Sequence, residues 1–394
     1  MTDTSPLTVR DPVNRLLLAE AAGLSTGPSS TAVVVIDDPD GQLTLSLLDL
    51  GVTHLRVHCD EVTAEREVLR AVGAAGRIRQ VTAFGSLGPD VVRGAKLVLL
   101  HLPKSLAALR EISLLVATHA SNDVVLLAGG RVKHMTRSMN TVLAEAFDQV
   151  RGTLGIGKAR GLVASRPARN KGSFDELALA AATLTDPELL AAAKLPPSGT
   201  LTVVARGGVF AGASLDLGTH ALLRTASQWP EQVDAVLDLG CGTGILTTTL
   251  ALRYPNATVV GADRSAAAVA STKATAEANG LASRTDADRG LDTLDRQPGS
   301  GCVVIIRDDA GDTLPTASFD LVVCNPPFHD RAAITTDTAY HMFAAAARLL
   351  RPGAEFWCVW NSHLRYRTTL NTVVGPTTQE YRDAKFTVTR SVRK

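Results

Sequence analysis

Short apolar runs and helical patterns alternate along the second half of the chain. The strand-like runs are 236–239, 257–262, 302–306, 319–324, 355–360 and 385–392. The segments with apolar residues at helical spacing are 245–253, 266–279 and 339–350. Gly280 and the Arg351-Pro352-Gly353 turn are typical of the ends of helices. Strands that alternate with helices predict a mostly parallel sheet covered by helices, an α/β fold.

The first half of the chain repeats this pattern, which indicates a duplicated domain. Its strand-like runs are 32–36, 54–59, 96–102, 123–128 and 158–164. The segment 97–104 lines up with 321–328, an offset of 224 residues that is too long for a solenoid repeat. The sequence therefore predicts a first domain over 1–170, a linker over 171–200 and a second domain over 201–394. Two fused, similar domains favour a monomer.

Composition narrows the setting in which the protein works. The chain has 394 residues, of which 45% are hydrophobic and 20% charged, as in ordinary soluble proteins. No apolar run reaches the roughly 18 residues of a membrane span, and the first residues lack the order of a signal peptide. The five cysteines are scattered and form no CxxC pair. We therefore expect a cytoplasmic protein without disulfides, a bound metal or a membrane partner.

Charge is unevenly distributed although the net charge is only +1. Residues 151–172 contain six basic and no acidic residues, among them Lys158 and Arg160. The last 34 residues carry seven basic residues against two acidic ones. Both segments are candidates for contact with a phosphate backbone. The alternative is that they are a solvated face and a charged tail.

A glycine-rich loop between a strand and a helix is the first candidate site. Asp238 ends the strand, and Gly240, Cys241, Gly242 and Gly244 follow in a GxGxG pattern. Ligands of open α/β sheets bind at this position, where glycines let the backbone approach them closely. The dinucleotide pattern is GxGxxG instead. An acid inside the strand end suits a ligand with an ammonium group, whereas the alternative is a tight turn without a ligand.

Other acidic residues follow neighbouring strands or precede the sheet. Asp263 ends the next strand, where an acid can accept both hydroxyls of a ribose, although it could also cap the following helix. Asp308 and Asp309 follow the third strand and could meet the amino group of an adenine. Asp216 lies in a segment of small residues that could close over the rest of the ligand, or form a packing turn.

The tetrapeptide Asn325-Pro326-Pro327-Phe328 follows an apolar strand and is the second candidate site. An Asn side-chain carbonyl and the carbonyl of Pro326 can accept both hydrogens of an exocyclic amine, which turns its lone pair toward a methyl donor. Consecutive prolines preorganise these acceptors. Pro327 and Phe328 could contact a flipped base, with Phe328 stacking on it. His329 could position the substrate; the alternative is a proline-stiffened strand exit.

Together these residues resemble the tandem-domain ribosomal RNA guanine-N2 methyltransferases of bacteria. The segments that carry the resemblance are 208–218, 237–244, Asp263, 325–329, 333–335, 339–343, 361–366, 102–106 and 157–160. The resemblance implies two Rossmann-like class I methyltransferase domains, of which the C-terminal one binds S-adenosylmethionine and catalyses. It also implies that the degenerate N-terminal domain helps to bind ribosomal RNA or a partly assembled subunit.

The sequence fits this division of labour. The first domain has 36–41 in place of a glycine loop and His101-Leu102-Pro103-Lys104 in place of the tetrapeptide. Segments 333–335 and 339–343 are more similar to the enzyme of the large-subunit (23S) RNA than to that of the small-subunit (16S) RNA. The acidic pair at 308–309 departs from the family, which tends to have Asn there, and puts the adenine contact in doubt.

Four other functions remain open from the sequence. A protein-glutamine N5 methyltransferase or a nucleic-acid adenine N6 methyltransferase could use the same tetrapeptide. The former usually has Tyr at its fourth position and a small helical front domain, unlike this chain. An RNA-binding factor without activity is disfavoured by the intact Asp238, Asp263 and Asn325. A nicotinamide-dependent dehydrogenase is disfavoured by the loop spacing.

Overall fold

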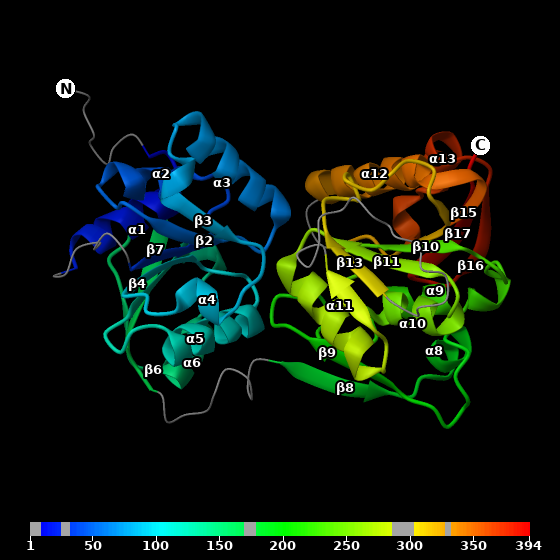
Figure 1. Cartoon of the computed structure of the whole chain (residues 1–394), viewed down its shortest axis with the longest axis horizontal. Coiled ribbons are helices and arrows are strands. Elements are labelled where there is room, and N and C mark those ends of the chain that lie inside the picture. The colour runs from blue at the N-terminus through cyan, green and yellow to red at the C-terminus, as the bar shows by residue number, and fades with distance from the viewer. Residues whose placement is uncertain (1–8, 25–31, 169–178, 286–302, 328–331) are drawn as a thin grey trace. The chain divides into compact units, whose positions relative to one another are not determined.

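The computed structural model describes residues 9–24, 32–168, 179–285, 303–327 and 332–394, with backbone only for 332–336. The chain divides into two compact units. Unit 1 comprises Met1–Leu179 and Arg206–Gly208, and unit 2 comprises Ala180–Ala205 and Val209–Lys394. Each unit contains a mostly parallel sheet with helices on both faces (Figure 1). The predicted α/β fold with two such sheets is confirmed.

Unit 1 has a seven-stranded sheet in the order β3-β2-β1-β4-β5-β7-β6. Strands β1 to β5 are parallel, and β7 is antiparallel to both β5 and β6. The strands are β1 Val33–Ile36, β2 Leu55–His58, β3 Val81–Phe84, β4 Leu97–His101, β5 Val125–Arg131, β6 Phe147–Gly152 and β7 Ala159–Pro167. The helices are α1 Pro12–Ala22, α2 Gln42–Asp49, α3 Val62–Ala74, α4 Pro89–Val92, α5 Leu106–His119 and α6 Arg137–Ala146.

Unit 2 has an eight-stranded sheet in the order β12-β13-β11-β10-β14-β15-β17-β16. Its strands are β10 Ala235–Leu239, β11 Thr258–Asp263, β12 Ser283–Thr285, β13 Val303–Arg307, β14 Phe319–Cys324, β15 Leu350–Asn361, β16 Thr377–Arg382 and β17 Phe386–Val392. A separate hairpin joins β8 Ala180–Leu184 to β9 Leu201–Ala205. The helices are α8 Pro187–Ala192, α9 Leu217–Leu223, α10 Ile245–Arg253, α11 Ala266–Ala278, α12 Ala332–Leu349 and α13 Arg367–Val373.

Alternate residues of each strand supply two cores, one on each face of a sheet. In β10, Val236 belongs to the core under α8 to α11, whereas Leu237 belongs to the core under α12 and α13. In β1, Val34 and Val35 divide in the same way between the two cores of unit 1. Strands buried on both faces explain the continuous apolar runs in the sequence. Figure 1 shows the helices above and below each sheet.

The two sheets repeat one another in register. Ile36 of β1 pairs with Leu100 of β4, and Leu239 of β10 pairs with Cys324 of β14. His101 comes directly after Leu100, and Asn325 comes directly after Cys324. His101 and Asn325 therefore occupy equivalent positions. The loop after the central strand starts alike in both units. Its first N–H donates to the neighbouring strand over 2.8 Å, from residue 37 in unit 1 and 240 in unit 2.

The structure differs from the sequence-based boundaries in three places. Residues 180–192, expected in the linker over 171–200, form β8 and α8 and fold with unit 2. Leu189 and Leu190 of α8 are buried, so this segment contributes to the core. Helix α12 begins at Ala332 rather than at residue 339. Strand β15 already begins at Leu350, which pairs with Phe319 ahead of the Pro-Gly turn.

Membrane-spanning helices were not expected. Within the part of the chain that the structure describes, no helix combines the length and the apolar character that a bilayer crossing requires.

Candidate active site

The glycine loop lies between β10 and α10 and depends on left-handed backbone. Gly240, Gly242 and Gly244 have φ angles of 86°, 55° and 79°, a region that glycine enters without strain. A Cβ on Gly244 would lie 2.7 Å from the Cα of Thr272, so α10 and α11 can approach only because residue 244 is glycine. A Cβ on Gly242 would meet nothing within 4 Å, which leaves open space beside the loop.

Asp238 lies under this loop and is fully buried. Its Oδ2 accepts a hydrogen bond from Thr247 Oγ1 over 2.6 Å, whereas its Oδ1 has no hydrogen-bond partner. Burial raises the pKa of Asp238 to about 7, and the negative charge of Asp263 adds to the rise. A buried carboxylate oxygen without a donor is costly unless a ligand supplies one. This orphaned oxygen fits a ligand that carries an ammonium group.

The side chain of Cys241 lies on the inner side of the same loop. Its Sγ accepts a hydrogen bond from Thr272 Oγ1 over 3.2 Å. Burial raises the pKa of the Cys241 thiol well above its usual value, so this cysteine stays protonated and unreactive. Its predicted contact with the cofactor stays a prediction.

Asp263 ends β11 and ties the loop to the sheet. Its Oδ2 accepts from Gly242 N over 3.0 Å, and its Oδ1 accepts from Ser265 N over 3.0 Å. The cap of α11 is Ser265, whose side chain accepts from Ala268 N. Asp263 therefore fixes both the loop and the turn before α11, and its predicted contact with a ribose stays a prediction.

Asp308 follows β13 and is buried. It is 1% exposed, and its Oδ1 accepts from Asp309 N over 2.9 Å. Its Oδ2 accepts from Thr313 N over 2.7 Å and from Thr313 Oγ1 over 2.8 Å. These bonds close the loop after β13. The structure thus gives Asp308 a loop-closing role, and its contact with an adenine is untested.

Asn325 follows β14 and meets the first turn of α9. Its Nδ2 donates to Asp216 Oδ1 over 3.1 Å and to Thr219 Oγ1 over 3.0 Å. The same Asp216 oxygen caps α9 by accepting from Gly218 N and Thr219 N. Asp216 therefore holds Asn325, and its expected approach to the cofactor stays a prediction. Pro326 is buried, which anchors the loop directly after Asn325.

The rest of the tetrapeptide is described only in part. Pro327 is exposed at the end of the described segment. Phe328 and His329 lie outside the described residues, so their roles as stacking and positioning residues stay predictions.

Unit 1 has lost this chemistry at the equivalent positions. Asp37 occupies the place of Gly240, with a left-handed φ of 61°. Buried Asp38 accepts through its Oδ2 from Thr44 N over 2.8 Å and from Thr44 Oγ1 over 2.7 Å. His101, at the place of Asn325, contacts Asn14 Oδ1 through its Nε2 over 2.7 Å. Asp37 and Pro39 thus occupy the positions of Gly240 and Gly242 in unit 2.

Basic side chains gather elsewhere on unit 1. Lys158 and Arg160 are exposed near the start of β7. Val132 N donates to the carbonyl of Lys158 over 3.0 Å, which brings the segment 131–137 beside them. Lys133 and Arg137 in this segment are also exposed. The sequence pattern RVKHMTR contains three basic residues and a histidine but no acid, a signal that could have identified this addition.

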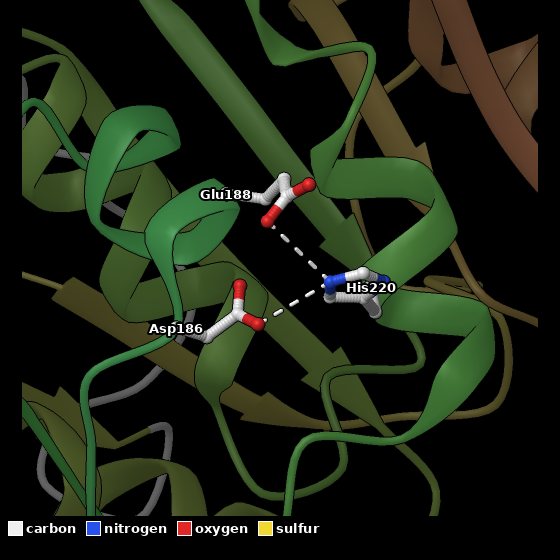
Figure 2. Close-up of side chains that lie close together, drawn as sticks. All are labelled: Asp186, Glu188 and His220. Carbon is white, nitrogen blue, oxygen red and sulfur yellow. Dashed lines mark ion pairs between the residues drawn. The ribbon is translucent and has the colours of Figure 1, made fainter.

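Two groups of side chains in the described part of the chain have the composition of metal ligands. In Figure 2, His220 Nε2 lies 3.3 Å from Asp186 Oδ2 and 3.6 Å from Glu188 Oε2. Glu188 also pairs with Arg224, and Asp186 caps α8 through Leu189 N. These ion pairs tie α9 to the start of α8 and account for all three groups. The other group is Asp309, Asp312 and His341, whose His341 lies 3.9 Å from each acid.

Three polar residues of the site were missed from the sequence. Thr247 binds Asp238, and Thr219 binds Asn325. Asn361 ends β15, and its Oδ1 is buried without a hydrogen-bond partner. Each lies three residues after a recognisable position: Thr247 after Gly244, Thr219 after the N-cap Asp216, and Asn361 after Cys358, which pairs with Cys324. Threonine and asparagine are too common at such positions to be singled out from the sequence.

Comparisons with known proteins identify the families that both units resemble. The model of the Methyltransferase small domain matches residues 200–390, and that of the RLMG N-terminal domain matches residues 2–169. A T. thermophilus 16S rRNA N2 methyltransferase, solved with AdoMet and guanosine, has a TM-score of 0.72 at 24% identity. That alignment covers 98% of this chain and 92% of the solved chain, and it shows a shared fold.

Two relatives are named Ribosomal RNA large subunit methyltransferase G. The one from Stutzerimonas stutzeri is 28% identical, over 98% of this chain and 94% of its own length. The one from Streptomyces coelicolor is 32% identical, over 93% of this chain and 89% of its own length. This identity extends over nearly the whole of both proteins, and the chain belongs to the ribosomal RNA large subunit methyltransferase G family.

Proposed function

We propose that this protein transfers a methyl group from S-adenosylmethionine to the exocyclic N2 amine of a guanine in ribosomal RNA, with large-subunit RNA as substrate. The observation that carries the proposal is the held amide of Asn325 at the same sheet edge as the glycine loop. Asn325 follows β14 and the loop follows β10, and these two strands are paired neighbours. The carboxyl ends of neighbouring parallel strands are where such folds bind ligands.

The residues of unit 2 fit the cofactor. The orphaned Oδ1 of Asp238 suits the ammonium of its methionine part, and Asp263 suits its ribose. A Cβ on Gly242 would meet nothing within 4 Å, so the cofactor can approach the backbone of the loop there. The bound cofactor supplies an electrophilic methyl group.

The mechanism needs acceptors for the amine and no strong base. Asn325 Oδ1 accepts one amine hydrogen and the carbonyl of Pro326 accepts the other, so the nitrogen lone pair points at the methyl group. The buried Pro326 keeps both acceptors in place before substrate binds. The amine becomes strongly acidic as the methyl group transfers, and its proton can leave to water. Phe328 stacks on the flipped guanine, with Pro327 and His329 beside it.

Ribosomal RNA as the substrate is supported by two observations. Relatives that align over nearly the whole chain are named for the large ribosomal subunit. Unit 1, the degenerate domain over 1–170, carries the basic surface of Lys158, Arg160, Lys133 and Arg137. Such a surface attracts phosphates irrespective of sequence. In this proposal unit 1 holds the RNA or a partly assembled subunit, the domain over 201–394 catalyses, and the protein acts as a cytoplasmic monomer.

Mass mapping of ribosomal RNA tests the proposal. RNA from cells that lack this protein should miss one N2-methylguanine in the large-subunit RNA, and the purified protein with S-adenosylmethionine should restore it. Loss of a small-subunit guanine would move the substrate to the other subunit. Unchanged guanines together with a lost methyl group on adenine or on a protein glutamine would replace the proposal with one of the alternatives.

A further inference from the structure

The side-chain amide of Asn325 has two possible orientations, and only one of them suits methyl transfer. With Oδ1 toward the substrate, the amide accepts a hydrogen from the amine. With Nδ2 toward the substrate, two groups that only donate would face each other. Hydrogen bonds that fix the orientation of the amide are therefore part of what methyl transfer requires.

The first turn of α9 provides such hydrogen bonds. Nδ2 of Asn325 donates to Asp216 Oδ1 over 3.1 Å and to Thr219 Oγ1 over 3.0 Å. An ionised carboxylate only accepts hydrogen bonds, so a flipped amide would place its Oδ1 against another acceptor. Asp216 also accepts from Gly218 N over 2.9 Å and Thr219 N over 3.1 Å, so its oxygen cannot turn away without uncapping the helix.

Close packing reinforces this arrangement. A Cβ on Gly218 would lie 2.9 Å from Asn325 Oδ1 and 3.1 Å from Asp216 Oδ1. The missing side chain is thus what lets the helix reach the amide. The same helix also carries His220, which pairs with Asp186 and Glu188 at the start of α8 and so anchors α9 (Figure 2).

The equivalent position in unit 1 repeats the layout with other residues. Helix α1 packs on β5 and β7 as α9 packs on β15 and β17. Asp11 caps α1 by accepting from Val13 N and Asn14 N. Asn14, three residues after this cap, contacts His101 at the place of Asn325. In both units, therefore, the residue three positions after the helix cap contacts the end of a central strand: α1 meets the end of β4 in unit 1, and α9 meets the end of β14 in unit 2.

We propose that Asp216 and Thr219 are positioning residues for methyl transfer, which fix the Asn325 amide with its Oδ1 toward the amine. The inference rests on the proposed function, because it assigns Asn325 the role of amine acceptor. Asp216 and Thr219 touch neither reacting atom; they act through Asn325. Their loss is expected to lower the rate of the chemical step without changing the binding of cofactor or RNA.

Matched substitutions at position 219 isolate the hydroxyl group. Thr219→Val removes it at nearly constant shape, and Thr219→Ser retains it. We expect Thr219→Val to slow single-turnover methyl transfer about tenfold, the effect of one lost hydrogen bond, and Thr219→Ser to stay within about twofold of wild type. Dissociation constants of S-adenosylmethionine and of the RNA should change less than about twofold. Equal rates for Thr219→Val and wild type would overturn the inference.

Asp216→Ser tests the acceptor-only partner. Serine caps helices about as well as aspartate, but its hydroxyl can also donate and so permits the flipped amide. We expect a rate about 10- to 100-fold lower, with an unchanged thermal midpoint. If this variant does not fold, the pair at position 219 still decides.

A double-substitution cycle separates positioning from a general structural effect. In an Asn325→Ala background, Thr219→Val should cause no further loss of the residual rate, because its partner is gone. A further tenfold loss there would show that Thr219 does not act through Asn325, and would overturn the inference. Failure of the proposed function gives a different result: wild-type protein would then methylate no guanine of ribosomal RNA at all.

Discussion

The two units have the same order of the seven equivalent strands, but their buried acids stand at different positions: within the central strand in unit 2 and in the loop after it in unit 1. In unit 2, Asp238 within β10 accepts from Thr247. In unit 1 the equivalent strand position is Val35, and Asp38 in the following loop accepts from Thr44. Both threonines lie three residues after the glycine that precedes their helix. An acid–threonine pair thus survives in the unit that has lost its glycine loop.

The comparison separates what the fold needs from what the chemistry needs. Apolar strand residues and the glycine before the helix recur in both units, because packing of strand and helix depends on them. Gly41 and Gly244 both have left-handed backbone at the start of their helix. Gly240 and Gly242, in contrast, are replaced by Asp37 and Pro39 in unit 1. A Cβ on Gly240 would lie 3.0 Å from Met342 Cε, whereas one on Gly242 would meet nothing within 4 Å, so Gly242 is the one of the two that leaves open space. Their contact with a ligand stays a prediction.

The sharpest test of this difference compares Asn325, which follows β14, with His101, which ends β4. Asn325→Ala removes an acceptor that we place at the reacting amine and should lower kcat about 100- to 1000-fold, with cofactor affinity retained. His101→Ala changes the equivalent residue of unit 1 and should leave kcat within about threefold. Steady-state kinetics and calorimetry with S-adenosylmethionine measure both. A large loss in His101→Ala would contradict the assignment of all chemistry to unit 2.

A second test compares the two buried acids. Asp238→Asn removes the charge that we assign to the cofactor ammonium and should weaken S-adenosylmethionine binding about 10- to 100-fold at pH 8. The raised pKa of about 7 means that wild-type Asp238 becomes protonated as the pH falls from 8 to 6. Wild-type affinity should therefore fall over this range, while that of the variant stays level. Calorimetry across pH checks this, with Asp38→Asn as the control that leaves affinity unchanged.

A third test addresses the surface that only unit 1 is proposed to use. Lys158→Glu combined with Arg160→Glu should weaken RNA binding about tenfold at 0.1 M salt and lower the steepness of its salt dependence by about two charges. Arg79→Glu reverses one exposed charge before β3, at the other edge of the same sheet, and is a control that changes the net charge half as much. Filter binding at several salt concentrations provides the measurement. Equal weakening by both variants would indicate a nonspecific effect of net charge.

The smallest expected effect concerns stability. Burial raises the pKa of Asp38, with bonds from Thr44 opposing the rise. A raised folded-state pKa favours the protonated acid, so stability falls as the pH rises above the ordinary range of a carboxyl group. Asp38→Asn should therefore raise the thermal midpoint by a few degrees at pH 8 and by less at pH 5. A midpoint that rises equally at both values would argue against an ionised, buried acid.

Sequence patterns were sufficient for the features that depend on local periodicity. The strands β10, β11 and β14, the glycine loop and the equivalence of His101 and Asn325 all follow from runs and offsets along the chain. The roles of Asp216 and Asp308 did not follow. Both are caps or loop-closing groups whose partners are chosen by tertiary packing, and Asn325 is 109 residues away from Asp216. Segment 180–192 is rich in alanine and contains a proline, so its sequence does not reveal that Leu189 and Leu190 are buried in the core of unit 2.

The glycine at 218 has a practical consequence for capturing the enzyme on its RNA. A methyl group added at this position would lie too close to the side-chain oxygen Oδ1 of Asn325. It would change neither the glycine loop nor the basic surface of unit 1. Gly218→Ala is thus a design for a protein that loads cofactor and RNA but stalls before transfer. A stalled complex of this kind is a specimen from which the methylated nucleotide could be read directly by imaging.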